Sequence, residues 1–224
     1  MEKLEMNISD LILYKDNQII VFNKPAGMLT QADDKEDKSL IDLAEIYCKH
    51  KVYPLHRLDR PAAGIVVFAK NKKALLFLTK QLEERTFNKT YLAWVKSAPS
   101  PDNATLKHFI KRNGKLKKAF CSNESKSGYK EAELKYKTIF TSDNYSLLEI
   151  NLISGRFHQI RAQLSEIKSP IKGDVKYGAR RSNADRSIDL LARSITFVHP
   201  TNGISQTITV PIPNTSLWQS AGLD

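Results

Sequence analysis

Short apolar runs separated by turn signals constrain the fold of this chain more than any other feature of its sequence. Ile19–Asn23 and Ile65–Ala69 are rich in the β-branched and aromatic residues that strands favour. Apolar residues recur at helical spacing only at about 39–48, 71–85 and 157–167. Because strands outnumber helices and short turns join most of them, we expect an α+β protein with a largely antiparallel sheet.

Polar residues mark where several of these elements begin and turn. Ser39 and Asn71 immediately precede the first two helical stretches, where each is suited to cap a helix N-terminus. Asn113-Gly114 lies between two alternating stretches of Leu106–Phe120 and predicts a tight hairpin turn. Further strands are expected at Leu11–Tyr14, Thr90–Val95, Leu134–Ile139, Ser146–Ile153, Leu190–Leu191 with Ile195–Val198, and Gln206–Val210.

The charge is unevenly distributed along the 224 residues, whose net charge is +11. Residues 1–50 contain 6 basic and 10 acidic side chains, and the remaining 29 basic and 14 acidic side chains follow. A basic surplus concentrated in one part of a chain favours a polyanionic partner, most simply the phosphates of a nucleic acid. Lysines that only keep the protein in solution explain the charge equally well.

Several classes of protein lack support in the sequence. Two cysteines, Cys48 and Cys121, give no disulfide framework and no tetrahedral metal site, which favours a reducing, cytoplasmic setting. No apolar run approaches the roughly 20 residues of a membrane helix, and the N-terminus has no signal-peptide core. Nucleotide-binding glycine loops and paired metal-binding histidines are also absent. We therefore expect no metal and no nucleotide cofactor.

One loop carries a carboxylate between two guanidinium groups. In Pro54–Gly64, Asp59 lies between Arg57 and Arg60, just before a buried strand. Neighbouring positive charges favour an ionised carboxylate, which suits a nucleophile or an electrostatic stabiliser. A structural salt bridge in a loop is the alternative reading, and the residues alone favour it.

A second polar segment lies at a strand-to-helix junction. Ser154–Arg161 places Arg156, His158 and Gln159 around the expected helix start, where backbone N–H groups are available to a ligand. A solvated first turn with one buried salt bridge is the alternative interpretation.

These segments resemble the RluA family of RNA pseudouridine synthases, and the Arg60-Pro61 pair resembles its TruC branch. The resemblance runs from about Leu13 to Pro213 and includes five ordered motifs: Phe22–Gly27, His56–Arg60 with Gly64, Lys89–Ala93, Gly155–Arg161 and Pro170–Gly178. It implies the pseudouridine synthase fold, with a mixed, largely antiparallel central sheet and flanking helices, in a single domain spanning 1–224. A separate RNA-binding domain of the S4 type is not expected.

The resemblance also implies a reaction and roles for particular residues. An isomerase of this family, using no metal or cofactor, would break the bond between uracil and ribose and rejoin the sugar to C5 of the same base. Asp59 would be the catalytic aspartate, Tyr91 would lie against the flipped-out base, and Arg161 would form a salt bridge that positions Asp59. Arg57 would occupy the space left by the flipped nucleotide, since chemistry on a base requires it to leave the stack.

RNA is the expected partner, either tRNA or ribosomal RNA, bound by a monomer. The hairpin from Lys107 to Lys118 is basic and contains no acidic residue, so it is suited to grip phosphates. Charges that protect an edge strand are the alternative for this hairpin. The expected RNA-binding side chains are His56, Arg57, Arg60, Arg156, His158, Gln159, Lys111, Arg112, Lys115, Lys117 and Lys118.

Two other functions are weighed against the synthase. A non-catalytic RNA-binding or assembly protein would keep the fold, but Asp59, Tyr91 and Arg161 are all present. A glycosidase would need a second carboxylate beside Asp59, and the nearest candidates, Glu83 and Glu84, are expected on an exposed helix face.

The Asp59 motif also departs from the pattern of the RluA family, because Ala63 stands just before Gly64 where the family commonly has Ser.

Overall fold

The computed structural model describes residues 7–32 and 38–223, and their contacts divide into two compact units. The first unit takes the chain up to Phe87 and adds Ser194–Val210, and the second contains Asn88–Arg193 and the chain from Pro211 onward. No helix in the described ranges is long and apolar enough to cross a membrane. That the two units act as one catalytic domain stays a prediction.

The first unit is built on a sheet with strand order β1, β2, β4, β10, in which β3 pairs with β4 and β11 with β10. β2 and β4 are antiparallel, from Ile19 opposite Ala69 to Lys24 opposite Gly64. Both strands are almost wholly buried, as predicted for Ile65–Ala69, and such continuous burial is typical of a strand covered on both faces. The elements of this unit are η1 (Ile8–Leu11), β1 (Ile12–Lys15), β2 (Ile19–Lys24), α1 (Leu40–Cys48), β3 (Tyr53–Pro54), β4 (Ala63–Ala69), α2 (Lys72–Glu83), the later part of β10 (Leu190–Val198) and β11 (Ser205–Thr209).

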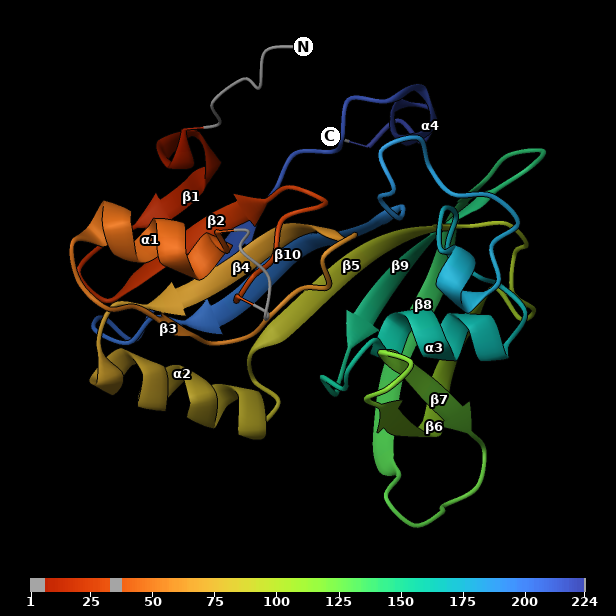
Figure 1. The fold of residues 1–224 in the computed structure, drawn as a ribbon, viewed down its shortest axis with the longest axis horizontal. Coiled ribbons are helices and arrows are strands. Elements are labelled where there is room, and N and C mark those ends of the chain that lie inside the picture. Colours follow the sequence, from red (N-terminus) through yellow and green to blue (C-terminus); the bar gives the residue numbers. More distant parts are fainter. Residues whose placement is uncertain (1–6, 33–37, 224) are drawn as a thin grey trace. The chain divides into compact units, whose positions relative to one another are not determined.

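The second unit is an antiparallel sheet with strand order β5, β9, β8, β6, β7. Helix α3 packs against β6 and β7, as Figure 1 shows. Together with the first unit this confirms the expected α+β class and the mostly antiparallel pairing. Its elements are β5 (Asn88–Val95), β6 (Asn103–Asn113), β7 (Lys118–Ser122), β8 (Lys130–Thr141), β9 (Ser146–Leu152), α3 (Gln159–Glu166), η2 (Val175–Tyr177), the first part of β10, and α4 (Ser216–Gln219).

Two helices begin where their capping residues predict. The backbone N–H and the hydroxyl of Ser39 both donate to the Asp42 carboxylate, at 2.9 and 2.7 Å, at the start of α1. The Asn71 side chain accepts the N–H of Ala74 at 2.9 Å at the start of α2. Glu83 and Glu84 are exposed at the end of α2, as expected.

Two local predictions need correction. The hairpin between β6 and β7 has a wider turn than the one predicted at Asn113-Gly114, because Asn113 pairs with Lys118 across a loop of residues 114–117. The Asn113 side chain closes this loop by accepting the N–H of Leu116 at 3.0 Å, and Lys117, with φ 44°, takes the left-handed conformation. Helix α3 begins two residues later than predicted, since His158, with φ 51°, cannot continue a right-handed helix.

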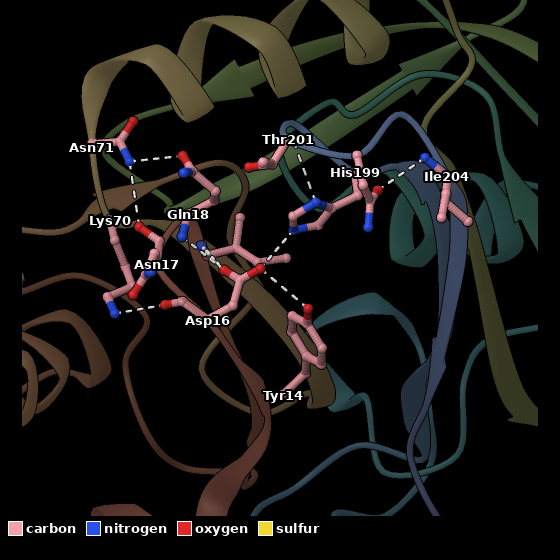
Figure 2. A network of polar contacts seen from close by, with 11 residues as sticks. Tyr14, Asp16, Asn17, Gln18, Lys70, Asn71, His199, Thr201 and Ile204 are labelled. Atoms are coloured by element: carbon pink, nitrogen blue, oxygen red, sulfur yellow. Dashed lines mark hydrogen bonds and ion pairs between the residues drawn. The ribbon is translucent and has the colours of Figure 1, made fainter.

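A polar network closes the turn between β1 and β2 (Figure 2). The Asp16 carboxylate accepts the backbone N–H groups of Gln18 and Ile19, at 2.7 and 2.8 Å, and Nε2–H of His199 at 2.6 Å. Nδ1 of His199 accepts the N–H of Thr201 at 3.3 Å, so Nε2 carries the proton that bonds to Asp16. The network therefore joins this turn to the segment between β10 and β11, within the first unit.

Candidate active site

The loop that carries Asp59 is fixed by the segment that follows β2. The N–H of Gly27 donates to the Arg60 carbonyl at 2.7 Å, and Nε of Arg60 donates back to the Gly27 carbonyl at 2.9 Å. Gly27 has φ 86°, a left-handed conformation that glycine adopts without strain. One side of the Asp59 loop is therefore held by a backbone hydrogen bond and by a side-chain hydrogen bond, both to Gly27.

A buried threonine holds the residue just before Asp59. The Thr30 hydroxyl donates to the Leu58 carbonyl and accepts the Leu58 N–H, both at 3.1 Å. Thr30 and Leu58 are 3% and 6% exposed, so this reciprocal pair is shielded from water. The early Phe22–Gly27 motif and the Asp59 motif thus belong to one local structure, which the sequence resemblance alone did not explain.

Lys24 is a residue of this structure to which the sequence analysis gave no role. Its side chain is fully buried, and its ammonium group donates to the carbonyl oxygens of Pro25, Met28 and Ala62, at 2.9, 3.0 and 2.7 Å. Burial lowers the pKa of Lys24 to about 7, and the nearby negative charge of Asp59 acts in the opposite direction. Lys24 thus holds both loops together and, in its protonated form, adds a positive charge near Asp59.

The side chains around Asp59 differ in exposure. Arg57 and Arg60 are exposed, whereas Asp59 and His56 are half-buried. Nε2 of His56 accepts the N–H of Val67 at 3.3 Å, which ties His56 to β4. The loop therefore presents a half-buried carboxylate beside two exposed cations. Hydrogen bonds from Gly27, Thr30 and Lys24 hold the backbone of this loop.

In the second unit, two of the predicted motifs lie next to each other. Tyr91 is on β5, 6% exposed, with its Cα opposite that of Ile150 on β9. A Cβ atom placed on Gly155 would lie 3.7 Å from the ammonium nitrogen of Lys89. Burial lowers the pKa of Lys89. The motif around Tyr91 and the motif before α3 are therefore neighbours.

Gln159 orders the segment before α3. Its side-chain oxygen accepts the N–H of Arg156 at 2.9 Å and the hydroxyl of Ser154 at 2.8 Å, and its amide nitrogen donates to the Glu133 carbonyl at 3.1 Å. Gln159 is 3% exposed, whereas Arg156 is exposed. Of these two expected RNA-binding residues, only Arg156 presents its side chain to solvent.

Arg161 is held by Asp174, an acid of the Pro170–Gly178 motif for which the sequence predicts no role. Nε and Nη2 of Arg161 donate to the two carboxylate oxygens of Asp174, at 2.7 and 2.9 Å. Both side chains are buried, at 5% and 2% exposure. Two parallel bonds to one carboxylate fix the plane of the guanidinium group. A salt bridge from Arg161 to Asp59 stays a prediction.

The basic hairpin has both exposed and engaged side chains. Lys111, Arg112, Lys115 and Lys117 are exposed, and Lys118 is half-buried. The guanidinium carbon of Arg112 lies 4.7 Å from the centre of the Phe157 ring, and Nζ of Lys118 lies 5.0 Å from the centre of the Tyr177 ring. The hairpin is thus attached to the segment around α3 by cation–aromatic contacts.

Comparison with known proteins supports the resemblance. The family model described as RNA pseudouridylate synthase matches residues 18–166, well over half of the chain. An uncharacterized RNA pseudouridine synthase of Mycoplasma pneumoniae is 36% identical over 193 residues, which cover 85% of this chain and 62% of that protein. The ribosomal large subunit pseudouridine synthase D of Borreliella burgdorferi is 32% identical, with 84% of this chain and 60% of that protein covered. The chain thus spans about three fifths of these two relatives.

Other similarities extend over nearly the whole length of both chains. The tRNA pseudouridine synthase C of Haemophilus ducreyi is 30% identical over 226 residues, covering 93% of this chain and 92% of that protein. The solved structure of human RNA Pseudouridylate Synthase Domain Containing 4 shares the fold, with a TM-score of 0.75 at 21% identity, and covers 96% of this chain and 92% of that one. The chain belongs to the RNA pseudouridylate synthase family and, within it, to the RluA family.

Proposed function

We propose that this chain is an isomerase that converts uridine to pseudouridine in structured RNA. The observation that carries the proposal is the Asp59 loop, in which Lys24, Thr30 and Gly27 hold the backbone on both sides of a half-buried carboxylate, in a chain of this family. A carboxylate on a fixed backbone is suited to act on a substrate because little reorganisation is needed at the moment of reaction.

The proposed reaction needs no co-reactant. The bond between N1 of uracil and C1′ of ribose breaks, the base turns, and C1′ bonds to C5 of the same base. The hydrogen on C5 then leaves as a proton, and N1 gains a proton, so that substrate and product have the same atoms. Asp59 acts on the nucleotide as a carboxylate during bond cleavage, after the target has left the RNA stack.

The other predicted catalytic residues support this step. Tyr91 would lie against the base and take part in removing the C5 proton, because a tyrosine offers both a ring for stacking and a hydroxyl for proton transfer. Arg161 would position Asp59 through a group that Asp174 does not use, since Asp174 takes Nε and Nη2. Arg57, which is exposed, would fill the space left by the flipped nucleotide.

RNA contacts are assigned to the side chains that reach solvent. These are Arg57, Arg60, Arg156, Lys111, Arg112, Lys115 and Lys117. Four other residues make contacts inside the protein: His56, His158, Gln159 and Lys118. We propose that they contribute to RNA binding mainly by ordering the exposed side chains named above.

Transfer RNA is the substrate class to test first. A relative matched along nearly its full length is named a tRNA pseudouridine synthase, and the Arg60-Pro61 pair resembles the same branch. Ribosomal RNA is the alternative, because another relative is named for the ribosomal large subunit. The proposal includes a monomer that acts in the cytoplasm, and light scattering of the purified protein tests the monomeric state.

The decisive experiment compares wild-type protein with Asp59→Asn on tRNA and ribosomal RNA, with pseudouridine mapped by carbodiimide labelling and primer extension. We expect Asp59→Asn to lower the rate of pseudouridine formation by about 10²- to 10⁴-fold, while RNA affinity changes little. Asp10→Asn, an exposed carboxylate in the same unit, is the matched control and should keep the wild-type rate. Turnover by Asp59→Asn at the control's rate would contradict the assignment.

The hairpin is tested through the salt dependence of RNA binding. Changing Lys111, Lys115 and Lys117 to Gln should weaken binding and lower the slope of log K against log salt by roughly 0.7 to 0.9 for each lost phosphate contact. The matched control changes three exposed lysines on β8, Lys130, Lys135 and Lys137, to Gln. If both triple variants give the same slope, the hairpin has no special place in the RNA interface.

A non-catalytic RNA-binding protein on the same fold is the second candidate. It predicts RNA affinity without turnover for the wild type, on both classes of RNA. The mapping experiment therefore separates the two functions directly.

A further inference from the structure

We propose that Tyr177 is a positioning residue that couples the basic hairpin β6–β7 to Arg161. The inference rests on the proposed function, because it assigns the hairpin to RNA binding and Arg161 to the catalytic machinery. It concerns only residues of the second unit.

The Tyr177 hydroxyl joins two segments that are far apart in the sequence. Its oxygen accepts the N–H of Ala119, on β7 of the hairpin, at 2.7 Å. It also lies 2.9 Å from Nδ1 of His158, the residue that precedes α3. Tyr177 is 3% exposed, and a buried hydroxyl without such partners would be unfavourable. A phenylalanine would fill the same core position, so the hydroxyl is there for these contacts.

The Tyr177 ring makes a cation–π contact with the guanidinium group of Arg161. The guanidinium carbon lies 4.8 Å from the ring centre, while Asp174 binds the same group through two hydrogen bonds. Asp174 also accepts the N–H of Tyr177 at its backbone carbonyl, at 2.9 Å. One short segment, Asp174–Tyr177, therefore contacts Arg161 from two directions, with a carboxylate and with a ring.

The same segment holds the tip of the hairpin. Nζ of Lys176 donates to the carbonyl oxygens of Leu116 and Lys117, at 3.4 and 3.0 Å. Arg112, on β6, lies over the Phe157 ring, which stacks on His158 at 3.8 Å between ring centres. We therefore expect a shift of the hairpin to displace Tyr177, His158 or both, through these surface contacts and the buried Ala119–Tyr177 hydrogen bond.

These contacts give RNA binding a physical route to Arg161. RNA phosphates bound to the exposed lysines of the hairpin would restrict the motion of the hairpin. Because Ala119 of the hairpin is hydrogen-bonded to Tyr177, the motion of Tyr177 and of the Arg161 guanidinium group beside it would also be restricted. Spatial proximity alone does not establish coupling, so the test is a double-mutant cycle.

The cycle combines Tyr177→Phe with Lys115→Gln/Lys117→Gln, and single-turnover rates at saturating enzyme are measured beside RNA affinity. In the wild-type background we expect the hairpin change to weaken affinity about tenfold and to lower the saturated rate several-fold. In the Tyr177→Phe background we expect the affinity effect to persist and the rate effect to vanish. Rate effects that simply multiply would overturn the coupling.

Tyr136→Phe is the matched control for Tyr177→Phe. Tyr136 is 4% exposed in the same unit, and its hydroxyl donates to the Pro101 carbonyl at 2.8 Å. Both variants lose one buried hydroxyl, so urea unfolding should register both, and only Tyr177→Phe should lower the saturated rate. If Tyr177→Phe and Tyr136→Phe have equal saturated rates, the role of Tyr177 is structural only.

A spectroscopic measurement keeps the inference testable when no turnover is seen. The Nε–H of Arg161 should give a protected signal in ¹H–¹⁵N spectra, because it is buried against Asp174. We expect Tyr177→Phe to speed its exchange with solvent at least tenfold and Tyr136→Phe to leave it unchanged. Lys176→Met, which frees only the hairpin tip, should act in the same direction with a smaller effect, and it replaces Tyr177→Phe if that variant fails to fold. If Tyr177→Phe leaves the exchange rate of the Arg161 Nε–H unchanged, the positioning role is refuted. If the wild type forms no pseudouridine but Tyr177→Phe speeds this exchange, only the proposed function is refuted.

Discussion

The two units of this protein each contain a network of polar groups, and the networks differ in burial and in what they connect. In the first unit, Asp16 is 26% exposed, and its carboxylate satisfies backbone N–H groups of its own turn together with His199 (Figure 2). In the second unit, Arg161 and Asp174 are 5% and 2% exposed and bind each other through two hydrogen bonds. The first network closes a turn, and the second holds one side chain in a defined orientation.

This difference separates a structural network from a candidate functional one. A buried ion pair contributes little net stability, because removing two charges from water offsets most of their attraction. The Asp16 network is explained by the backbone groups that it satisfies and by its link to His199. The Arg161–Asp174 pair is better explained by the geometry that it imposes on the guanidinium group, and Tyr177 and the hairpin extend it toward the proposed RNA surface.

The largest expected effect comes from breaking the second network. Asp174→Asn leaves the Arg161 charge buried without its carboxylate, and we expect it to lower the free energy of unfolding by about 3–5 kcal/mol. Urea unfolding measures this, with the exposed Asp102→Asn as the control. A loss below about 1 kcal/mol would mean that the pair is weakly coupled to folding.

A double variant sharpens the same comparison. Replacing both members, as Arg161→Met with Asp174→Leu, should recover most of that stability, because an apolar pair has no uncompensated charge. Pseudouridine formation by this double variant should be absent, because it lacks the Arg161 guanidinium group. If turnover returned together with stability, the guanidinium group would have no part in the reaction.

An intermediate effect is expected from the first network. In Asp16→Asn an amide N–H₂ replaces the oxygen that faces Nε2–H of His199, so that two donors meet. We expect a loss of about 1–3 kcal/mol in the free energy of unfolding. Saturated single-turnover rates should stay at the wild-type value, and a lowered rate would remove the distinction between the two networks.

The smallest expected effect is a pH dependence of stability. Burial raises the pKa of Asp16, but hydrogen bonds from Ile19, Gln18, His199 and Tyr14 outweigh it and bring the pKa below the usual value of 3.8. The stability that this carboxylate contributes is therefore complete above pH 3.8 and is lost as the pH falls through the lower, folded-state pKa. The difference between wild type and Asp16→Asn should shrink in that range and stay constant above it, which chemical unfolding in a pH series will show.

The sequence predicted those elements whose signals are local. Ser39 and Asn71 marked two helix starts because capping depends on groups a few residues apart. The start of α3 was misplaced because His158 adopts a left-handed conformation, which its residue type does not announce. The hairpin turn was misjudged because the Asn113 side chain, rather than Gly114, closes the loop.

The site was only partly predictable for a different reason. The motifs predict roles for Asp59, Tyr91 and Arg161, but pairings between distant residues depend on the folded chain. Asp174 binds Arg161 across 13 positions, and Lys24 reaches the carbonyl of Ala62 across 38. A lysine next to a proline in a basic protein gives no sign that it will be buried, so its role could not have been found from spacing.

Because Lys24 is buried, its chemical reactivity reports on local opening of the loops around Asp59. Amine-reactive reagents will modify the exposed lysines first, because the Lys24 nitrogen is covered and occupied by three carbonyl groups. Its labelling must wait until the loops around Asp59 separate. The rate at which this one amine is acylated, read by mass spectrometry, therefore counts how often the predicted catalytic loop comes apart.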